Sequence, residues 1–198
     1  MTETLRQTLL AYALDCAADV SHGEGHIRRV LKNALALAKG YPEADRDALA
    51  AAAILHDCAQ AEQIADSSVH HAEAGAKKAE RFLRGLGLSE SFIERVCAAI
   101  AAHSSPERAG KAGIEARLLF DADKLDMCGA VGLSRALMYA LDRGEALYSA
   151  DGESFWQVAQ NDADFVEENL FTPEARALAA RRLALSRAFL ENLEDEAK

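Results

Sequence analysis

The ten residues AAAILHDCAQ, Ala51 to Gln60, decide the fold of this chain and also raise a chemical question. Small apolar residues fill the sequence from Leu49 onward, which predicts the interior of a buried helix. This run ends in His56, which is followed directly by Asp57. An isolated carboxylate in such a setting is costly unless it is paired or bound to a metal. We therefore expect other polar residues of the chain to meet His56 and Asp57.

Composition favours helices. The chain has 198 residues and half of them are hydrophobic, which is enough for one domain with a sizeable core. Only 17 residues are Val, Ile or Thr, so the chain is poor material for a sheet. We expect a single all-α domain over residues 1–198, with a motif-bearing core at about 20–135 and further helices at about 136–195.

The net charge of the chain limits the classes of binding partner that we expect. The formal net charge of −10 argues against a nucleic-acid polymer and against a polybasic membrane surface. No apolar run approaches the roughly 20 residues of a membrane span, and the N-terminus lacks a cationic start and a cleavage site. We expect a cytoplasmic protein, and a homodimer is one assembly that the sequence allows. The cysteines lack a C-x-x-C pair and are expected to be reduced and buried: Cys16, Cys58, Cys97 and Cys128.

Periodicity and capping residues give the expected elements. We expect helices over about 3–19, from "SHGEGH" to Lys39, through His56, from about Ser68 to 86, and from Ser89 to His103. "SSPERAGKAG" is expected to be a loop with one helical turn at Pro106. Residues 114–129 and the following "VGLSRALMYALDRG" are predicted to be helical, and "SADGES" a turn. The last helix is expected to begin with Thr172 as N-cap and Pro173 as its first residue.

All six histidines lie in the first 103 residues: His22, His26, His56, His70, His71 and His103. His26 follows "SHGEG", where Gly23 and Gly25 are expected to let the backbone turn tightly and approach a ligand. If His56 and Asp57 are consecutive on a helix, they lie about 100° apart and can reach one site. Imidazole and carboxylate together suit Mn, Fe, Zn or Ni.

A third acidic segment, "FDADKLD", places Asp121, Asp123 and Asp126 beside three leucines. The order of segments is then "GHIRRV", "AAAILHD", "HHAEAGA", "IAAH" and "DADKLDMCGAVGL". This pattern over about residues 20–135 resembles the metal-binding signature of the HD-domain phosphohydrolase superfamily, and the segment "FVEENLFTPEARALAARRLALSRAFL" resembles the closing helices of small stand-alone bacterial members. The resemblance implies an HD-domain-like helical bundle with extra C-terminal helices.

The resemblance also implies a ligand set. His26, His56, Asp57 and Asp123 would hold one divalent metal, which would activate a water molecule to attack phosphorus and polarise a phosphoryl oxygen. The metal would be Mn, Fe, Ni, Zn or Mg, with one ion firmly bound and a second as an alternative. Asp57 and Lys124 would act in catalysis, and the substrate would be a small phosphorylated compound such as a nucleotide.

Two further histidines match positions that hold a second metal in some members. His71 stands four residues before Gly75, and His103 falls near the end of the next helix. They would bind a second metal or contact phosphate, or else stand as polar residues at the rim of the site. We expect His70 to be exposed and His22 to contact substrate or solvent.

Phosphate also needs cations that do not bind the metal. Lys124 follows Asp123 directly, and Arg29 lies three residues after His26, so we expect both to contact substrate. Lys77 and Lys78 are further candidates, although a solvated helix charge is the ordinary role for each of these cations.

Gln60 departs from the family pattern. Members that hydrolyse (p)ppGpp, and some nucleotidases, carry a glutamate three residues after the HD aspartate. An amide cannot act as a general acid or base, and Glu62 is expected to face elsewhere. This disfavours (p)ppGpp and favours activated phosphates. Two alternatives stay open: an HD-type di-iron oxygenase, and a catalytically silent, metal-stabilised interaction domain.

Overall fold

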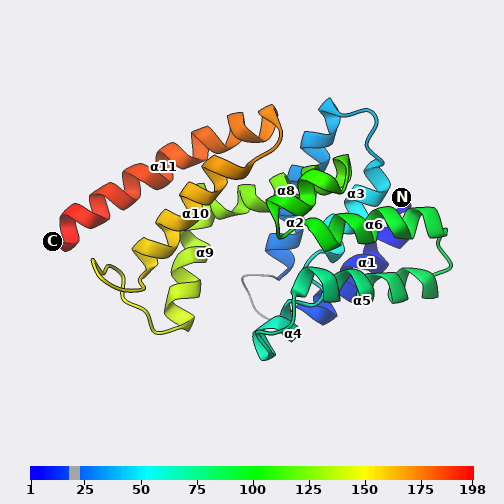
Figure 1. Cartoon of the computed structure of the whole chain (residues 1–198), viewed down its shortest axis with the longest axis horizontal. Coiled ribbons are helices and arrows are strands. Elements are labelled where there is room, and N and C mark those ends of the chain that lie inside the picture. Colours follow the sequence, from blue (N-terminus) through cyan, green and yellow to red (C-terminus); the bar gives the residue numbers. More distant parts are fainter. Residues whose placement is uncertain (18–22) are drawn as a thin grey trace. The chain divides into compact units, whose positions relative to one another are not determined.

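The structure is a computed structural model that describes residues 1–17 and 23–198 (Figure 1). The described chain is all-α, as predicted, and its only β pairing is an isolated bridge between Ala146 and Ser154. It forms two compact units, Met1–Asp123 and Lys124–Lys198, and each is described by itself. No helix in the described ranges is long and apolar enough to cross a membrane.

The unit Met1–Asp123 is built from eight α-helices, counted over its described residues. They are α1 (Glu3–Cys16), α2 (Glu24–Leu37), α3 (Arg46–Leu55), α4 (Gln60–Ala65), α5 (His71–Gly85), α6 (Glu90–Ala102), α7 (Pro106–Lys111) and α8 (Ile114–Lys124), whose last residue begins the second unit. A short 3₁₀ turn, Ala38–Gly40, follows α2.

Helix α3 is the centre of this unit. Asp45 caps it by accepting hydrogen bonds from the amides of Asp47 and Ala48, which satisfies two free donors of its first turn. Every residue from Ala48 to Leu55 is buried, and α3 packs against α1, α2 and α6. Its small alanines let these helices approach closely, so the apolar run does form the buried helix that the sequence predicts.

Several helix boundaries differ from the expectations. Helix α3 ends at Leu55, before His56, and a short helix α4 follows the turn. Helix α5 begins at His71 and not near Ser68, because Ser68 is held in a local turn by the Asp66 carboxylate. Ser89 is the N-cap of α6 by position, although its side chain makes no capping hydrogen bond.

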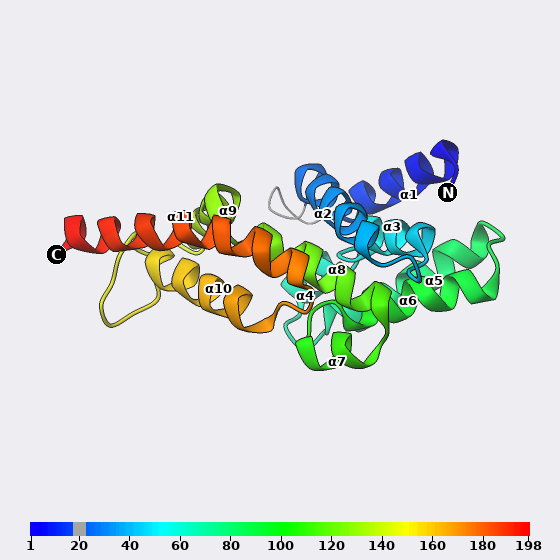
Figure 2. The ribbon, with the colours of Figure 1, turned by 90° about the horizontal axis from the view of Figure 1, so that it is seen from above.

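The unit Lys124–Lys198 holds the 3₁₀ turn Leu125–Met127 and the helices α9 (Gly129–Asp142), α10 (Phe155–Asn169) and α11 (Pro173–Ala197). Thr172 caps α11 and Pro173 is its first residue, as predicted. Helices α10 and α11 run side by side (Figure 2). The sequence reading missed α10, which begins where Ser154 accepts a hydrogen bond from the amide of Gln157.

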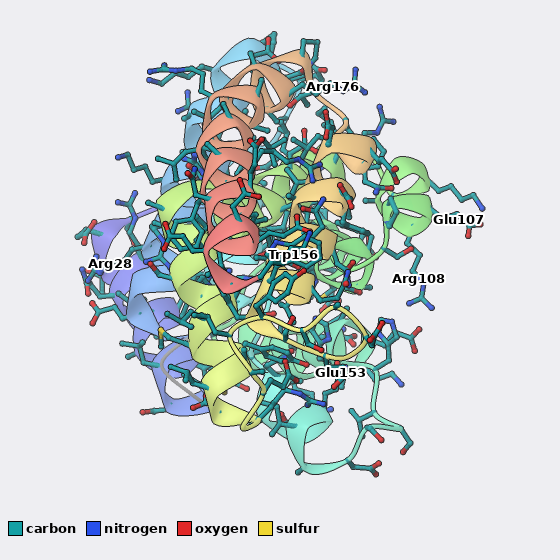
Figure 3. The ribbon with its side chains drawn as sticks, turned by 90° about the vertical axis from the view of Figure 1, so that its left-hand side faces the viewer. Arg28, Glu107, Arg108, Glu153, Trp156 and Arg176 are labelled. Carbon is teal, nitrogen blue, oxygen red and sulfur yellow. The ribbon has the colours of Figure 1, made fainter. Side chains whose placement is uncertain are left out.

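The core of this unit lies between its three helices. One cluster of buried residues in this core is made of Leu133, Ala136 and Ala140 on α9, Phe155 and Ala159 on α10, and Leu190 on α11. Trp156 packs against them and donates a hydrogen bond from Nε1 to the carbonyl of Leu190, 3.0 Å away, so its indole lies beside α11 (Figure 3). An indole buried in this way keeps its one donor satisfied.

Candidate metal centre

His56 and Asp57 lie in a tight turn, and the expectation that both stand on one helix is wrong. The amide of Cys58 bonds to the carbonyl of Leu55, and the amide of Gln60 bonds to that of Asp57, at 3.0 and 2.9 Å. Each of these bonds joins residues three positions apart and closes a four-residue turn, so the α-helical ladder stops at Leu55. The directions of the two side chains are thus set by tertiary packing and not by the 100° rotation between successive residues of a helix.

The four residues with the predicted ligand role lie together. The Nε2 atoms of His26 and His56 are 3.1 Å apart, and Asp57 Oδ2 lies 3.5 Å from the first and 3.1 Å from the second. Asp123 Oδ1 lies 3.6 Å from His26 Nε2 and 3.9 Å from His56 Nε2. Ligand atoms that share a metal at about 2.0–2.2 Å lie roughly 3–4 Å from one another, so the spacing suits one metal ion.

A second group shares Asp57. His71 Nε2 and His103 Nε2 are 3.2 Å apart, and Asp57 Oδ1 lies 3.8 Å from His71 and 3.5 Å from His103. One carboxylate therefore has Oδ2 toward His26 and His56 and Oδ1 toward the other pair. The side chain of His103 is buried and that of His71 is 17% exposed, so the second group lies nearer to solvent.

Backbone carbonyls fix the orientation of two of these rings. Nδ1 of His56 lies 3.0 Å from the carbonyl of Ala53, and Nδ1 of His103 lies 2.7 Å from that of Ile100. Because a carbonyl only accepts, each Nδ1 carries a proton, so the ring proton that a metal ion would replace is the one on Nε2, where its loss leaves a lone pair. Lone pairs and carboxylate oxygens thus converge on two points, which is the donor set that a divalent cation requires.

The pKa values reflect this convergence. Burial opposes a charge on His56, but Asp57, Asp123 and the Ala53 carbonyl outweigh burial and raise its pKa to about 9. Burial likewise opposes a charge on Asp57, but attraction to His56 and hydrogen bonds from His103, His26 and His56 hold its pKa well below the usual value. This group of residues therefore attracts positive charge, either as a proton or as a metal ion.

Glycines next to the site have different roles from those expected. Neither Gly23 nor Gly25 has a positive φ, because Gly23 is an extended N-cap and Gly25 lies inside α2. A Cβ on Gly25 would lie 3.2 Å from Nη1 of Arg29, so the guanidinium lies close to this backbone. Gly75 is the residue that permits a close approach, since its Cβ would lie 3.3 Å from the carbonyl oxygen of His56.

The other residues that the sequence suggested as substrate contacts have different surroundings. Lys124 belongs to the second unit, where its charge acts on the carboxyl of Asp162, and Arg29 is half-buried on α2. His70 is exposed, as expected. His22 lies outside the described residues.

Two lysines and an arginine of neighbouring helices differ in their pairing. Lys77 is exposed, and Lys78 pairs with Glu62 at 2.6 Å. Arg108 of α7 pairs with Glu73 at 2.6 Å, on a helix whose charged side chains project outward (Figure 3).

Gln63 is a site residue that the sequence reading missed. Its Oε1 accepts a hydrogen bond from the backbone amide of His71 at 3.1 Å and also contacts Nδ1 of that ring. The two residues are eight positions apart and stand on different helices, so no helical spacing links them. The carbonyls of Ala53 and Ile100 could have been found, since each lies three residues before a histidine that ends a helix.

Comparison with known proteins gives one family match. The model of the HD domain matches residues 23–128, which is just over half of the chain and includes the six site residues from His26 to Asp123. The curated Bacillus subtilis protein YpgQ is 32% identical over 114 residues. That alignment covers 56% of this chain and 55% of YpgQ, so it spans about half the length of this relative.

Solved structures match over nearly the whole chain. A crystal structure of Bacillus subtilis YpgQ has 25% identity and a TM-score of 0.79, and the match covers 99% of this chain and 97% of that one. YpgQ has also been solved in complex with ADP, with a TM-score of 0.77, 25% identity and coverage of 96% and 97%. An HD-superfamily hydrolase from Bacillus thuringiensis matches with 26% identity, a TM-score of 0.73 and coverage of 98% and 97%.

Proposed function

Because this chain belongs to the HD domain family, we propose that it is a metal-dependent phosphohydrolase that cleaves a small phosphorylated compound, with nucleotides as the favoured class. Its fold is that of HD superfamily hydrolases. The observation that carries the proposal is the position of Asp57, whose two carboxylate oxygens face two pairs of imidazole Nε2 atoms.

We assign the metal ligands accordingly. His26, His56, Asp57 and Asp123 would hold the first ion, and His71 and His103 would complete a second position with Asp57. A bound divalent ion supplies the chemistry of the family, by acidifying a water molecule and polarising a phosphoryl oxygen. The protein holds the ligands in place through the Nδ1 hydrogen bonds of His56 and His103, so little reorganisation is needed on binding.

Nucleotides are favoured by two observations. YpgQ, which resembles this chain over nearly its full length, has been solved with ADP. Gln60 stands three residues after Asp57 and cannot transfer a proton, while Glu62 is engaged by Lys78. Without a carboxylate at position 60, a substrate with a good leaving group is cleaved most readily, and pyrophosphate leaving a nucleoside triphosphate is such a group. General acid–base help is otherwise worth roughly 10²–10⁴-fold.

The substrate contacts are also proposals. Arg29 stands one turn after His26 on α2 and supplies a guanidinium suited to phosphate. Lys124 follows Asp123 in α8, and we keep both Lys124 and His22 as expected phosphate contacts. A substitution of Arg29 should raise KM more than it lowers kcat, because a phosphate clamp binds the ground state as well.

A di-iron oxygenase is the second candidate, and the two ligand groups around Asp57 favour it over a silent domain. Such chemistry would require both positions to hold iron. A silent domain would have no need for six converging ligands.

One experiment separates these functions. The purified protein is loaded with Mn²⁺, Fe²⁺, Zn²⁺, Ni²⁺ or Mg²⁺, and kcat/KM is measured on a nucleoside triphosphate, a diphosphate, a monophosphate and ppGpp. We expect Mn²⁺ or another transition metal to support cleavage of the triphosphate best, because imidazole nitrogens dominate the site. A preference for ppGpp would overturn the argument from Gln60. No turnover of any phosphate, with oxygen uptake by the iron form, would transfer the assignment to the oxygenase.

A further inference from the structure

His71 differs from the other ring-fixed histidines in where it stands on its helix. His56 and His103 follow the last residues of α3 and α6, so each finds a carbonyl three residues earlier for its Nδ1 proton. His71 is the first residue of α5. The start of a helix presents free N–H groups and no free carbonyls, so the same arrangement is not open to His71.

Gln63 supplies what the start of α5 lacks. Its Oε1 accepts the backbone N–H of His71 at 3.1 Å, which is one of the free donors of the first turn. The same oxygen contacts Nδ1 of the ring. His70, the N-cap residue, makes no capping hydrogen bond from its side chain, so this amide oxygen acts as the cap.

Resting on the metal assignment of the proposed function, we propose that Gln63 is the positioning residue of the second metal position. By accepting both donors of His71, it keeps the proton on Nδ1 and turns the lone pair of Nε2 toward His103 and Asp57. Only the amide oxygen can do this, since the amide nitrogen is itself a donor. The short helix α4 therefore controls the second position without contributing a ligand.

The direct test compares metal binding by four proteins. Wild type, Gln63→Met, Gln63→Glu and Gln60→Met are titrated with Mn²⁺, and the two dissociation constants are measured separately. Methionine matches glutamine in size but lacks the acceptor, so Gln63→Met should weaken the second constant by about 10–100-fold and leave the first unchanged. Glutamate keeps an acceptor oxygen and should restore the second constant. Gln60→Met changes the same residue type on the same helix and should bind both ions like wild type.

A second measurement needs no metal. In metal-free protein labelled with ¹⁵N-histidine, the ring of His71, assigned by its loss in a His71→Asn variant, should carry its proton on Nδ1. In Gln63→Met it should shift toward the Nε2-protonated form, and Gln63→Glu should return it. Equal second-metal constants in Gln63→Met and wild type, or an unchanged tautomer, would overturn the proposal. A wild type that binds a single ion while the tautomer responds as expected would instead contradict the two-metal assignment and leave Gln63 as the residue that orients His71.

Discussion

At the scale of single residues, Asp57 links the two ligand groups. Its Oδ2 faces His26 and His56, and its Oδ1 faces His71 and His103. Asp123 Oδ1 lies 3.6 Å from His26 Nε2 and 3.9 Å from His56 Nε2, and a ligand atom of Asp123 also lies within 4.8 Å of those of His56 and His103. The two aspartates should therefore differ in what their removal costs.

Asp57→Asn is expected to abolish binding at both positions, because it removes the charge that both share. Asp123→Asn should weaken the first ion by more than the roughly 10–100-fold that loss of an outer hydrogen bond costs, and should weaken the second ion less than the first, because Asp123 Oδ1 lies closest to His26 and His56. Metal stoichiometry by elemental analysis, together with phosphatase activity, measures both effects. Full metal content in Asp57→Asn would contradict the ligand assignment.

The carboxyl group of Asp162 should make the stability of the protein depend on pH. Burial raises the pKa of this carboxyl on α10 to about 6, although Arg135 and Lys124 oppose the shift. Because the folded pKa lies above the ordinary value of 3.8, the folded state binds more protons between these limits, and stability falls as pH rises through them. Above pH 6 this carboxylate is charged in the folded state, and it lowers the free energy of unfolding by its full amount.

Asp162→Asn should therefore stabilise the protein by up to about 3 kcal/mol at pH 8 and have little effect at pH 3.5, since the pKa is raised from 3.8 to about 6 and one pKa unit is worth about 1.4 kcal/mol. Urea unfolding followed by the fluorescence of Trp156, the only tryptophan, gives the free energy at each pH. A gain that is the same at both pH values would show that the carboxylate charge is not its cause.

At the scale of elements, the start of α9 depends on close contact with the preceding 3₁₀ turn. A Cβ on Gly132 would lie 2.3 Å from both the carbonyl carbon and the oxygen of Met127, and backbone atoms cannot yield as a flexible side chain can. The Leu125–Met127 turn therefore packs onto α9 only because residue 132 has no side chain.

Gly132→Ala should lower the free energy of unfolding by about 2–3 kcal/mol, the upper part of the range for overpacking. Gly85→Ala is the matched control, because nothing lies within 4 Å of an added Cβ there and the helix gains from the substitution. Denaturant unfolding followed by circular dichroism measures both. Equal effects of the two variants would contradict the described contact.

At the scale of the whole molecule, removal of the metal should destabilise both compact units. The proposed ligands all lie in Met1–Asp123, whereas Trp156 lies in Lys124–Lys198. Helix α8 is continuous across the boundary, so Asp123 and Lys124 are successive residues of one helix. Unfolding of either unit would therefore disrupt the end of α8, which carries the proposed ligand Asp123.

A chelator should therefore lower the unfolding midpoint seen by circular dichroism and by Trp156 fluorescence together. A metal present at 100 times its dissociation constant stabilises by about 2.7 kcal/mol, which sets the expected size. Asp57→Asn should show no response to the chelator. A Trp156 transition that stays fixed while the dichroism transition moves would mean that the units unfold separately, against the expectation of one domain.

Much of the fold followed from the sequence alone. The scarcity of β-branched residues and the apolar run before His56 predicted an all-α chain with α3 buried, and the capping residues Thr172 and Pro173 gave the start of α11. Local patterns succeed here because helix formation and capping depend on residues within one or two turns. The order of the histidine and aspartate segments also named six residues that the fold brings together.

Only the tertiary structure decided how the side chains of those residues are oriented. The turn that replaces the end of α3, the approach of Gly75 to the His56 carbonyl and the hydrogen bonds from Gln63 to His71 join segments that no local period connects. Helix α10 was also missed from sequence. Spacing along a helix fixes which residues share a face, but the direction of a side chain in a turn depends on what packs against it. The sequence thus determined which side chains are available for a metal, and packing decided that one carboxylate serves two groups of histidines.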